Sequence, residues 1–266
     1  MNQFNSILIV GCGNMGGAML DGWLAGGVDP ARLAVLDPVA AEVPAGVELL
    51  RTAPQRQFDA VLLAIKPQLL DTVAPDIAAI AGGGTVILSV LAGVELASLA
   101  MRFPNADGHV RIMPNLSAAL GKSPVALAGR GLDEAARAAL ATLMEPLGAP
   151  EWLDESLFDA VTALAGSGPA FVYRFIDALA AGATALGIDP QQAGRLALAT
   201  VEGAAALASA SPHAPGELAR RVASPGGTTE AGLKVLDADQ ALAELVAATL
   251  KAAATRSAEM AAAARG

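Results

Sequence analysis

Short aliphatic runs alternate with segments of helical periodicity along the first part of the chain. The runs 7–10 and 61–65 show no alternation of polar and apolar residues, which favours strands buried on both faces of a parallel sheet. Further strands are predicted at residues 32–37, 47–50, 85–89, 110–113 and 123–128, and helices at residues 15–24, 67–80, 94–102 and 133–147. This order predicts an α/β domain with a doubly wound sheet, in which ligands lie at the carboxyl ends of the strands.

The strand pattern stops near Glu155, and the rest of the sequence predicts helices only. They are expected at residues 158–165, 169–186, 190–208, 215–223 and 241–264, with one more that begins at Thr228 or Thr229. Asp133 and Asp189 are predicted to cap two of the helices of the chain. We therefore predict two domains, residues 1–154 and 155–266. The Ala- and Leu-rich helices of the second domain need another chain or domain to pack against.

The first strand leads directly into a Gly-x-Gly-x-x-Gly turn, residues 11–16, at the start of a helix. In this context Gly11 permits the tight turn, Gly13 lets the backbone approach a pyrophosphate, and Gly16 allows close packing of helix on sheet. Asp37 follows about 20 residues later, at the end of the second strand, where a carboxylate binds a ribose. We interpret the turn as a dinucleotide site. The alternative is a glycine-rich turn that holds no ligand.

Other polar or glycine-containing segments follow the later strands of the predicted sheet. Lys66 comes directly after one strand, Ala92-Gly93 after the next, and Asn115 after the one that follows. The carboxyl ends of parallel strands meet at one edge of a sheet, so these segments and the glycine turn are expected to share one crevice.

A second candidate site lies in the helical part, in the run Ser-Pro-Gly-Gly-Thr-Thr at residues 224–229. This turn enters a helix and presents backbone N–H groups together with three hydroxyls. A helix N-terminus of this kind suits a carboxylate. An ordinary turn between helices, capped by threonine, is an equally good explanation of the pattern by itself.

Composition narrows the function classes further. Hydrophobic residues make up 54% of the chain and aromatic residues only 3%, so the core is built mainly from Ala, Leu and Val. The net charge of −9 disfavours nucleic acid as a partner, because phosphate binding needs a basic surface. A single cysteine, Cys12, fits a reducing compartment, and no uncharged run reaches membrane-spanning length without a break. We expect a cytoplasmic protein, with His109 and His213 on its surface.

Five motifs together resemble the pyrroline-5-carboxylate reductase family. They are residues 10–17, the run Ala-Ile-Lys-Pro-Gln at 64–68, Met-Pro-Asn at 113–115, the run from Asp159 to Ala170, and residues 224–233 with Leu218 upstream. They span nearly the whole chain in the order of the family. The resemblance implies a Rossmann-like dinucleotide-binding domain followed by an all-helical dimerisation domain. It implies reduction of (S)-1-pyrroline-5-carboxylate to L-proline, the last step of proline biosynthesis, by hydride from NADPH or NADH.

The resemblance also assigns roles to single residues, and it implies no metal. The cofactor contacts would be Gly11, Cys12, Gly13, Asn14, Met15 and Gly16 at the pyrophosphate, Ala64, Ile65, Lys66, Pro67, Val90, Leu91 and Ala92 on the nicotinamide side, and Asn115 nearby. The substrate contacts would be Ser224, Gly227, Thr228, Thr229 and Glu155, with Thr229 as the catalytic residue. The family further implies a homodimer in which the nicotinamide of one subunit faces residues 224–229 of the other, and assembly of such dimers into a decamer.

Two departures and two rival functions qualify this interpretation. Leu116-Ser117 stands where family members commonly have Thr-Pro, and Asp37-Pro38 stands where members that prefer NADPH often carry Ser, Thr or Arg. A β-hydroxyacid dehydrogenase would share the glycine turn but relies on a helical-domain lysine, and this chain has no lysine between Lys122 and Lys234. A non-catalytic dinucleotide-binding regulator is the other alternative, against which the intact run at 224–229 argues.

Overall fold

The structure, a computed structural model, describes residues 4–265. It divides into two compact units. The first comprises the chain up to Gly166 together with the segment from Ala252 onward, and the second comprises Ser167–Lys251. The C-terminal helix therefore contributes to both units, and each unit is described by itself below.

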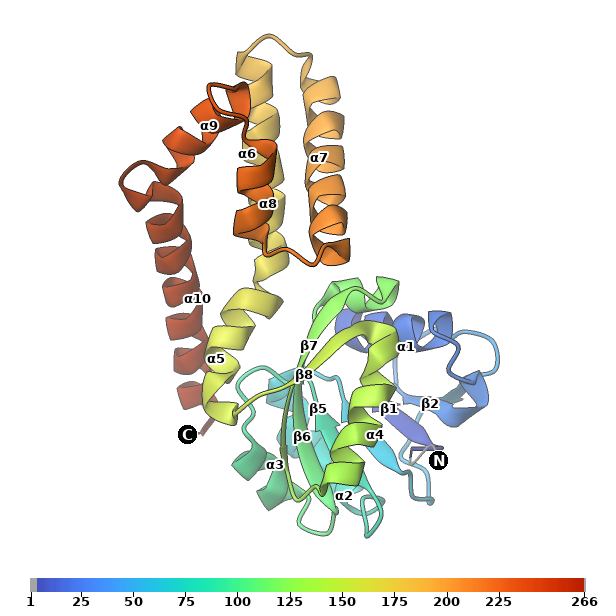
Figure 1. Cartoon of the computed structure of the whole chain (residues 1–266). Coiled ribbons are helices and arrows are strands. Elements are labelled where there is room, and N and C mark those ends of the chain that lie inside the picture. The colour runs from blue at the N-terminus through green and yellow to red at the C-terminus, as the bar shows by residue number, and fades with distance from the viewer. Residues whose placement is uncertain (1–3, 266) are drawn as a thin grey trace. The chain divides into compact units, whose positions relative to one another are not determined.

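The first unit is built around one sheet, which contains eight strands among the described residues in the order β3-β2-β1-β4-β5-β6-β7-β8. All neighbouring strands are parallel except β6 and β7 (Figure 1). The strands are β1 (Ile7–Val10), β2 (Leu33–Leu36), β3 (Glu48–Leu50), β4 (Ala60–Leu63), β5 (Val86–Ser89), β6 (Gly108–Met113), β7 (Ser123–Arg130) and β8 (Gly148–Trp152).

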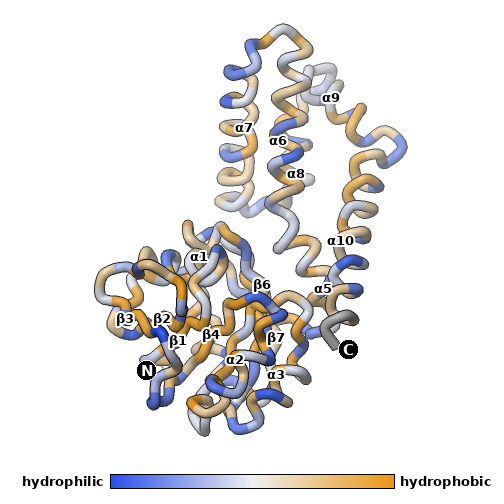
Figure 2. The backbone as a smooth tube through the Cα atoms, turned by 180° about the vertical axis from the view of Figure 1, so that it is seen from behind, coloured by the Kyte–Doolittle hydropathy of each residue, from blue (hydrophilic) through white to orange (hydrophobic). Residues whose placement is uncertain are grey.

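Helices cover both faces of this sheet, because successive residues of each buried strand point to opposite sides. On one face, Ile7 and Ile9 pack with residues of α1 (Asn14–Ala25) and α4 (Glu134–Met144). On the other face, strand residues such as Leu8 pack with α2 (Leu70–Ala78) and α3 (Leu96–Arg102). The strands are accordingly the most hydrophobic part of this unit (Figure 2).

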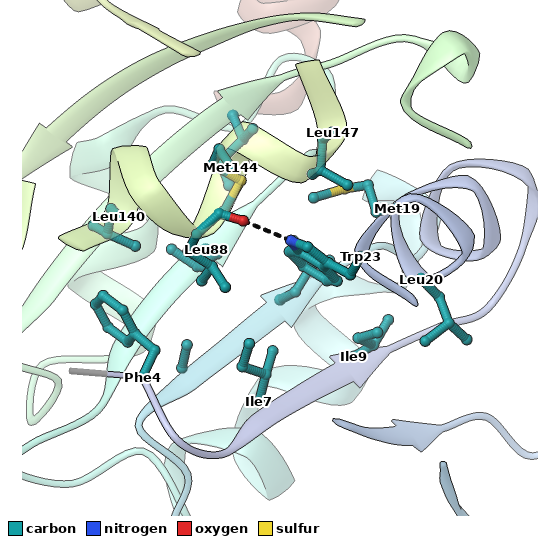
Figure 3. Packing of buried hydrophobic residues seen from close by; sticks show 14 of the residues in the cluster. Phe4, Ile7, Ile9, Met19, Leu20, Trp23, Leu88, Leu140, Met144 and Leu147 are labelled. Carbon is teal, nitrogen blue, oxygen red and sulfur yellow. Dashed lines mark hydrogen bonds between the residues drawn. The ribbon is translucent and has the colours of Figure 1, made fainter. Parts of the chain in front are cut away.

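Trp23 is the largest fully buried side chain and lies at the centre of the first face (Figure 3). Its indole Nε1 donates a 2.8 Å hydrogen bond to the carbonyl oxygen of Leu143. That bond satisfies the polar atom of an otherwise apolar side chain. It joins α1 to the end of α4, so the helix that follows the glycine turn is fixed from both the sheet and its neighbouring helix.

The second unit is helical: α6 (Gly168–Ala185), α7 (Pro190–Ala210), α8 (Pro215–Val222), α9 (Thr228–Asp237) and the first part of α10 (Ala241–Arg265). Among its described residues only Ala193 and Ala197 are buried, whereas large apolar side chains such as Tyr173 and Phe175 are exposed. A monomer rarely leaves so much apolar surface in water, so this unit needs a partner to cover it.

Most of the predicted elements are confirmed, including Asp133 and Asp189 as caps of α4 and α7. The edge strand β8 was not predicted, because its sequence, Gly-Ala-Pro-Glu-Trp, has no apolar run. The helix expected at 158–165 is α5 (Phe158–Val161) followed by a π-helix, Thr162–Gly166. The predicted domain boundary at 154/155 also differs from the division into compact units. Residues near Glu155 and the end of α10 pack with the sheet, so they fall in the first unit.

The surface position expected for His109 is wrong. The side chain lies in β6, only 6% exposed, with Nε2 3.0 Å from the carbonyl oxygen of Phe103. A carbonyl can only accept, so Nε2 carries the proton. Burial lowers the pKa of His109, which keeps the ring neutral in the folded protein.

Candidate active site

Two of the three glycines of the turn after β1 have packing reasons for lacking a side chain. Gly11 has φ +91°, and a Cβ there would lie 2.8 Å from the carbonyl oxygen of Ala64. A Cβ on Gly16 would lie 2.3 Å from the carbonyl oxygen of Gly11. The turn therefore sits directly against the end of β4, and the first turn of α1 sits directly against the glycine turn.

Gly13 is different, because nothing in the chain requires a glycine there. Its φ is −74°, and no atom lies within 4 Å of the position that a Cβ would take. Gly13 is exposed and precedes α1, whose N-terminus receives no hydrogen bond from a capping side chain and has no acidic residue in its first turn. Bare backbone at an uncapped helix N-terminus is the arrangement that binds phosphate. The residues present therefore fit a dinucleotide pyrophosphate.

Asp37 connects the end of β2 to this turn. Its Oδ2 accepts a 2.8 Å hydrogen bond from the N–H of Cys12, and its Oδ1 accepts from the N–H groups of Val39 and Ala40 at 2.9 and 3.0 Å. Burial raises the pKa of Asp37, but these N–H groups and Arg51 outweigh it, so the pKa is lowered overall. Asp37 is therefore ionised and holds the glycine turn next to the predicted ribose position.

The same environment acts in the opposite direction on Cys12. Burial raises the pKa of its thiol, and the negative charges of Asp37 and Asp21 raise it further. The thiol is therefore protonated at neutral pH, which argues for a small packing residue and against a reactive cysteine.

The ends of β4 and β5 supply the other predicted cofactor residues. Ala64 and Ile65 are half-buried beside the glycine turn, whereas Lys66 is exposed and precedes a short helix that begins at Pro67. After β5, Leu91 is buried and Ala92 is exposed. Adjacent strand ends thus bring the glycine turn, 64–67 and 90–92 to one edge of the sheet, as the sequence predicts.

Asn115 lies at the end of β6, but its side chain is committed to the protein itself. It is buried, and its Nδ2 donates a 2.9 Å hydrogen bond to the carbonyl oxygen of Ala165 in the π-helix. Its Oδ1 accepts from the N–H and the hydroxyl of Ser117. Asn115 therefore holds the π-helix to the edge of the sheet. Its contact with cofactor stays a prediction.

Glu155 likewise has partners within its own unit. Its Oε1 accepts a 2.8 Å hydrogen bond from the N–H of Leu96, at the start of α3, and a 2.9 Å hydrogen bond from Nη1 of Arg111. The guanidinium of Arg111 also lies 4.6 Å from the centre of the Phe158 ring. This cluster was not predicted from the sequence. Arg111 is visible there only as a charged residue inside a predicted strand, and the sequence does not indicate that its partner is Glu155. The substrate contact of Glu155 stays a prediction.

In the second unit, the run 224–229 forms a turn that leads into α9. The N–H of Gly227 donates to the carbonyl oxygen of Ser224 at 2.9 Å, and Gly226 has φ +72°. Gly227 has no side chain with which to cap α9, and Ser224, Thr228 and Thr229 are all exposed. Glu230, in the first turn of α9, accepts a 2.7 Å hydrogen bond from the N–H of Gly226. The turn therefore presents hydroxyls at a helix N-terminus that lacks an N-cap side chain, which suits an anionic group.

Comparison with known proteins supports one family. Residues 155–260 match the family model described as pyrroline-5-carboxylate reductase dimerisation. The pyrroline-5-carboxylate reductase of Pseudomonas aeruginosa is 36% identical over 264 residues, which cover 96% of each chain. Pyrroline-5-carboxylate reductase 2 of Bacillus subtilis is 33% identical over 94% of this chain and 93% of its own.

Solved structures agree with this result. The pyrroline-5-carboxylate reductase of Coxiella burnetii superimposes with a TM-score of 0.90 at 30% identity, over 97% of this chain and 99% of its own. A Plasmodium falciparum pyrroline carboxylate reductase with NADP bound has the same fold, with a TM-score of 0.83 at 22% identity over 98% of this chain and 99% of its own. On identity, coverage and fold together, the chain belongs to the pyrroline-5-carboxylate reductase family.

Proposed function

We propose that the chain reduces (S)-1-pyrroline-5-carboxylate to L-proline with NADPH or NADH. When bound, the dinucleotide supplies the hydride. The observation that carries the proposal is a pair of helix N-termini whose N-cap residue is a glycine, Gly13 before α1 and Gly227 before α9. The first suits a pyrophosphate and the second a carboxylate, and the reaction needs one site of each kind.

The first unit would hold the dinucleotide. The N–H groups at the start of α1 would bind the pyrophosphate, and Asp37 would accept from a ribose hydroxyl. The segments 64–67 and 90–92 would border the nicotinamide. The Asn115–Ala165 hydrogen bond would keep the adjoining π-helix in place. Short π-helical segments within helices are frequent at functional sites.

The second unit would hold the substrate. The N–H of Thr228 and the hydroxyl of Ser224 would bind the carboxylate, and the hydroxyl of Thr229 would donate to the ring nitrogen. Reduction of an imine places charge and then a proton on this nitrogen, so a positioned hydrogen bond stabilises the transition state. Such a reaction needs no strong base. This agrees with the buried, neutral state of His109.

The assembly is proposed at two levels. Residues 155–260 match the dimerisation model of the family, and the exposed apolar side chains of the second unit give a dimer its physical reason. We further propose that the site is completed by residues 224–229 of a second subunit and that dimers assemble into a decamer in the cytoplasm. Among the described residues, no helix is both long and apolar enough to cross a bilayer.

The test is turnover of pyrroline-5-carboxylate by the purified full chain, followed as oxidation of NADPH or NADH. Formation of proline in step with oxidation of the dinucleotide is the expected result. If the dinucleotide binds and no proline forms, the chain would be a dinucleotide-binding regulator. Turnover of β-hydroxyacids in place of the imine would favour the dehydrogenase alternative.

A further inference from the structure

The loop after β5, residues 90–94 and called the β5 loop below, lies against the C-terminal part of α10. At Gly93 the two backbones nearly touch. A Cβ at this position would lie 3.2 Å from Cα of Ala261, and Gly93 has φ +77°. Ala261 is itself only 6% exposed. Because the two backbones are this close, displacement of α10 would displace the β5 loop.

A hydrogen bond connects α10 to α5. The hydroxyl of Ser257 donates to Oδ1 of Asp159 at 2.7 Å, and Asp159 lies in α5 next to the buried Phe158. Ser257 and Ala261 are four residues apart, so they lie on the same face of the helix. The hydrogen bond and the contact with Gly93 therefore act on one side of α10. All of these residues belong to the first unit.

The start of α3, two residues beyond the β5 loop, is anchored by the same short segment of chain that contains Asp159. Glu155, four residues before Asp159, accepts from the N–H of Leu96, where α3 begins. Within the loop, the N–H of Val94 donates a 3.3 Å hydrogen bond to the carbonyl oxygen of Leu91.

The middle of the loop borders a pocket. A pocket of about 440 Å³ adjoins it, lined by residues that include Pro67, Ala92, Arg256 and Met260. Leu91 and Val94 are buried in the core, whereas Ala92 and Gly93 between them line the pocket. The contact between Gly93 and α10 therefore constrains the part of the loop that packing in the core does not hold.

We propose that Ser257 is a positioning residue for catalysis. Through Asp159 it holds Ala261 against Gly93 and so fixes the β5 loop that borders the nicotinamide. This rests on the proposed function, specifically on the placement of the nicotinamide beside residues 90–92. The loop would then be pre-organised for the cofactor before binding, which lowers the entropic cost of ordering it.

The first test is hydrogen exchange in the full-length protein without cofactor. Ser257→Ala is expected to speed exchange of the amides of the β5 loop several-fold, while Ser257→Thr, which keeps the hydroxyl, is expected to behave like wild type. Thr249→Ala is the matched control, because the hydroxyl of Thr249 donates within its own helix, to the carbonyl oxygen of Leu245. Unchanged exchange in Ser257→Ala would overturn the proposal.

The second test is steady-state kinetics. Ser257→Ala is expected to raise KM for the dinucleotide by about threefold to tenfold with kcat changed less than about twofold, and Ser257→Thr is expected to restore it. Ala92→Val alters the loop directly. It distinguishes an error in the proposed placement of the nicotinamide from an error in the proposed role of Ser257. If Ala92→Val leaves KM unchanged, the loop does not border the nicotinamide. If Ala92→Val raises KM and Ser257→Ala does not, Ser257 has no positioning role.

Discussion

A Cβ at position 16 would lie 2.3 Å from the carbonyl oxygen of Gly11, whereas a Cβ at Gly13 would meet no atom within 4 Å. Glycine at 16 is thus required by the fold. The fold places no such requirement on position 13. We therefore predict that the motif combines a glycine required by the fold with one that serves the bound dinucleotide, three residues apart.

Gly13→Ala and Gly16→Ala should therefore affect different properties, dinucleotide binding in the first variant and stability in the second. Gly16→Ala is expected to destabilise the protein by about 1–3 kcal/mol, since the added methyl must displace backbone. Gly13→Ala is expected to leave the thermal midpoint unchanged and to weaken dinucleotide binding. Thermal unfolding and titration with NADH and NADPH measure the two effects. Wild-type affinity in Gly13→Ala would mean that no phosphate approaches this residue.

Asp37 is expected to favour NADH over NADPH, because its carboxylate is ionised and faces the glycine turn. Asp37→Ser should shift the ratio of kcat/KM for the two cofactors toward NADPH by about tenfold or more, about 1.4 kcal/mol. The ratio is the measurement because the substitution also removes hydrogen bonds that hold the loop. Glu48→Gln, which neutralises a surface carboxylate paired with Arg56, is the control for net charge. If Asp37→Ser leaves the ratio of kcat/KM for the two cofactors unchanged, Asp37 organises the glycine turn and does not select the cofactor.

Local patterns in the sequence were enough to predict the sheet, the glycine turn and the turn before α9. Buried parallel strands such as Ile7–Val10 and turns that need glycine leave clear signals. Contacts between distant segments leave none. The sequence contains no sign that Asn115 bonds to Ala165, that Glu155 bonds to Leu96, or that the end of α10 returns to the first unit.

The prediction for His109 was wrong for a related reason. A histidine at the start of a strand is usually exposed, and only the tertiary fold places a carbonyl acceptor beside it. Burial lowers its pKa, the bond to Phe103 partly opposes this, and Arg130 adds to the lowering. The unfolded chain, with a pKa near 6.5, therefore binds more protons than the folded one below about pH 7.

It follows that His109 makes the folded protein less stable as the pH falls through and below about 6.5. His109→Gln, whose amide can still donate to Phe103, should lose less free energy of unfolding between pH 7 and pH 5 than wild type does. Urea unfolding of both proteins across this range provides the measurement, with His213→Gln as the control. Parallel pH profiles for wild type and His109→Gln would contradict the assignment.

Thr229 is expected to act in the chemical step through its hydroxyl. Thr229→Val should lower kcat/KM by about 10-fold to 1000-fold, equivalent to about 1.4–4 kcal/mol of transition-state stabilisation, with dinucleotide affinity unchanged. Thr228→Val is the matched control, because the proposed contact of Thr228 is its backbone N–H, which valine keeps. Equal losses in the two variants would show that the hydroxyl of Thr229 has no special role.

The last prediction concerns which chains supply the two halves of the site. Gly13→Glu should fold, because the position is open, and the added carboxylate should repel a phosphate there. Thr229→Val should fold as well, because Thr229 is exposed. Each variant alone is expected to have little activity.

Coexpression of the two variants with different tags allows mixed dimers to be purified. If the glycine turn of one subunit works with residues 224–229 of the other, each mixed dimer contains one site with both defects and one intact site, so activity returns. If both halves of a site belong to one chain, every site in a mixed dimer carries one defect. Mixed dimers as inactive as their parents would therefore refute the shared site while leaving the reaction itself untouched.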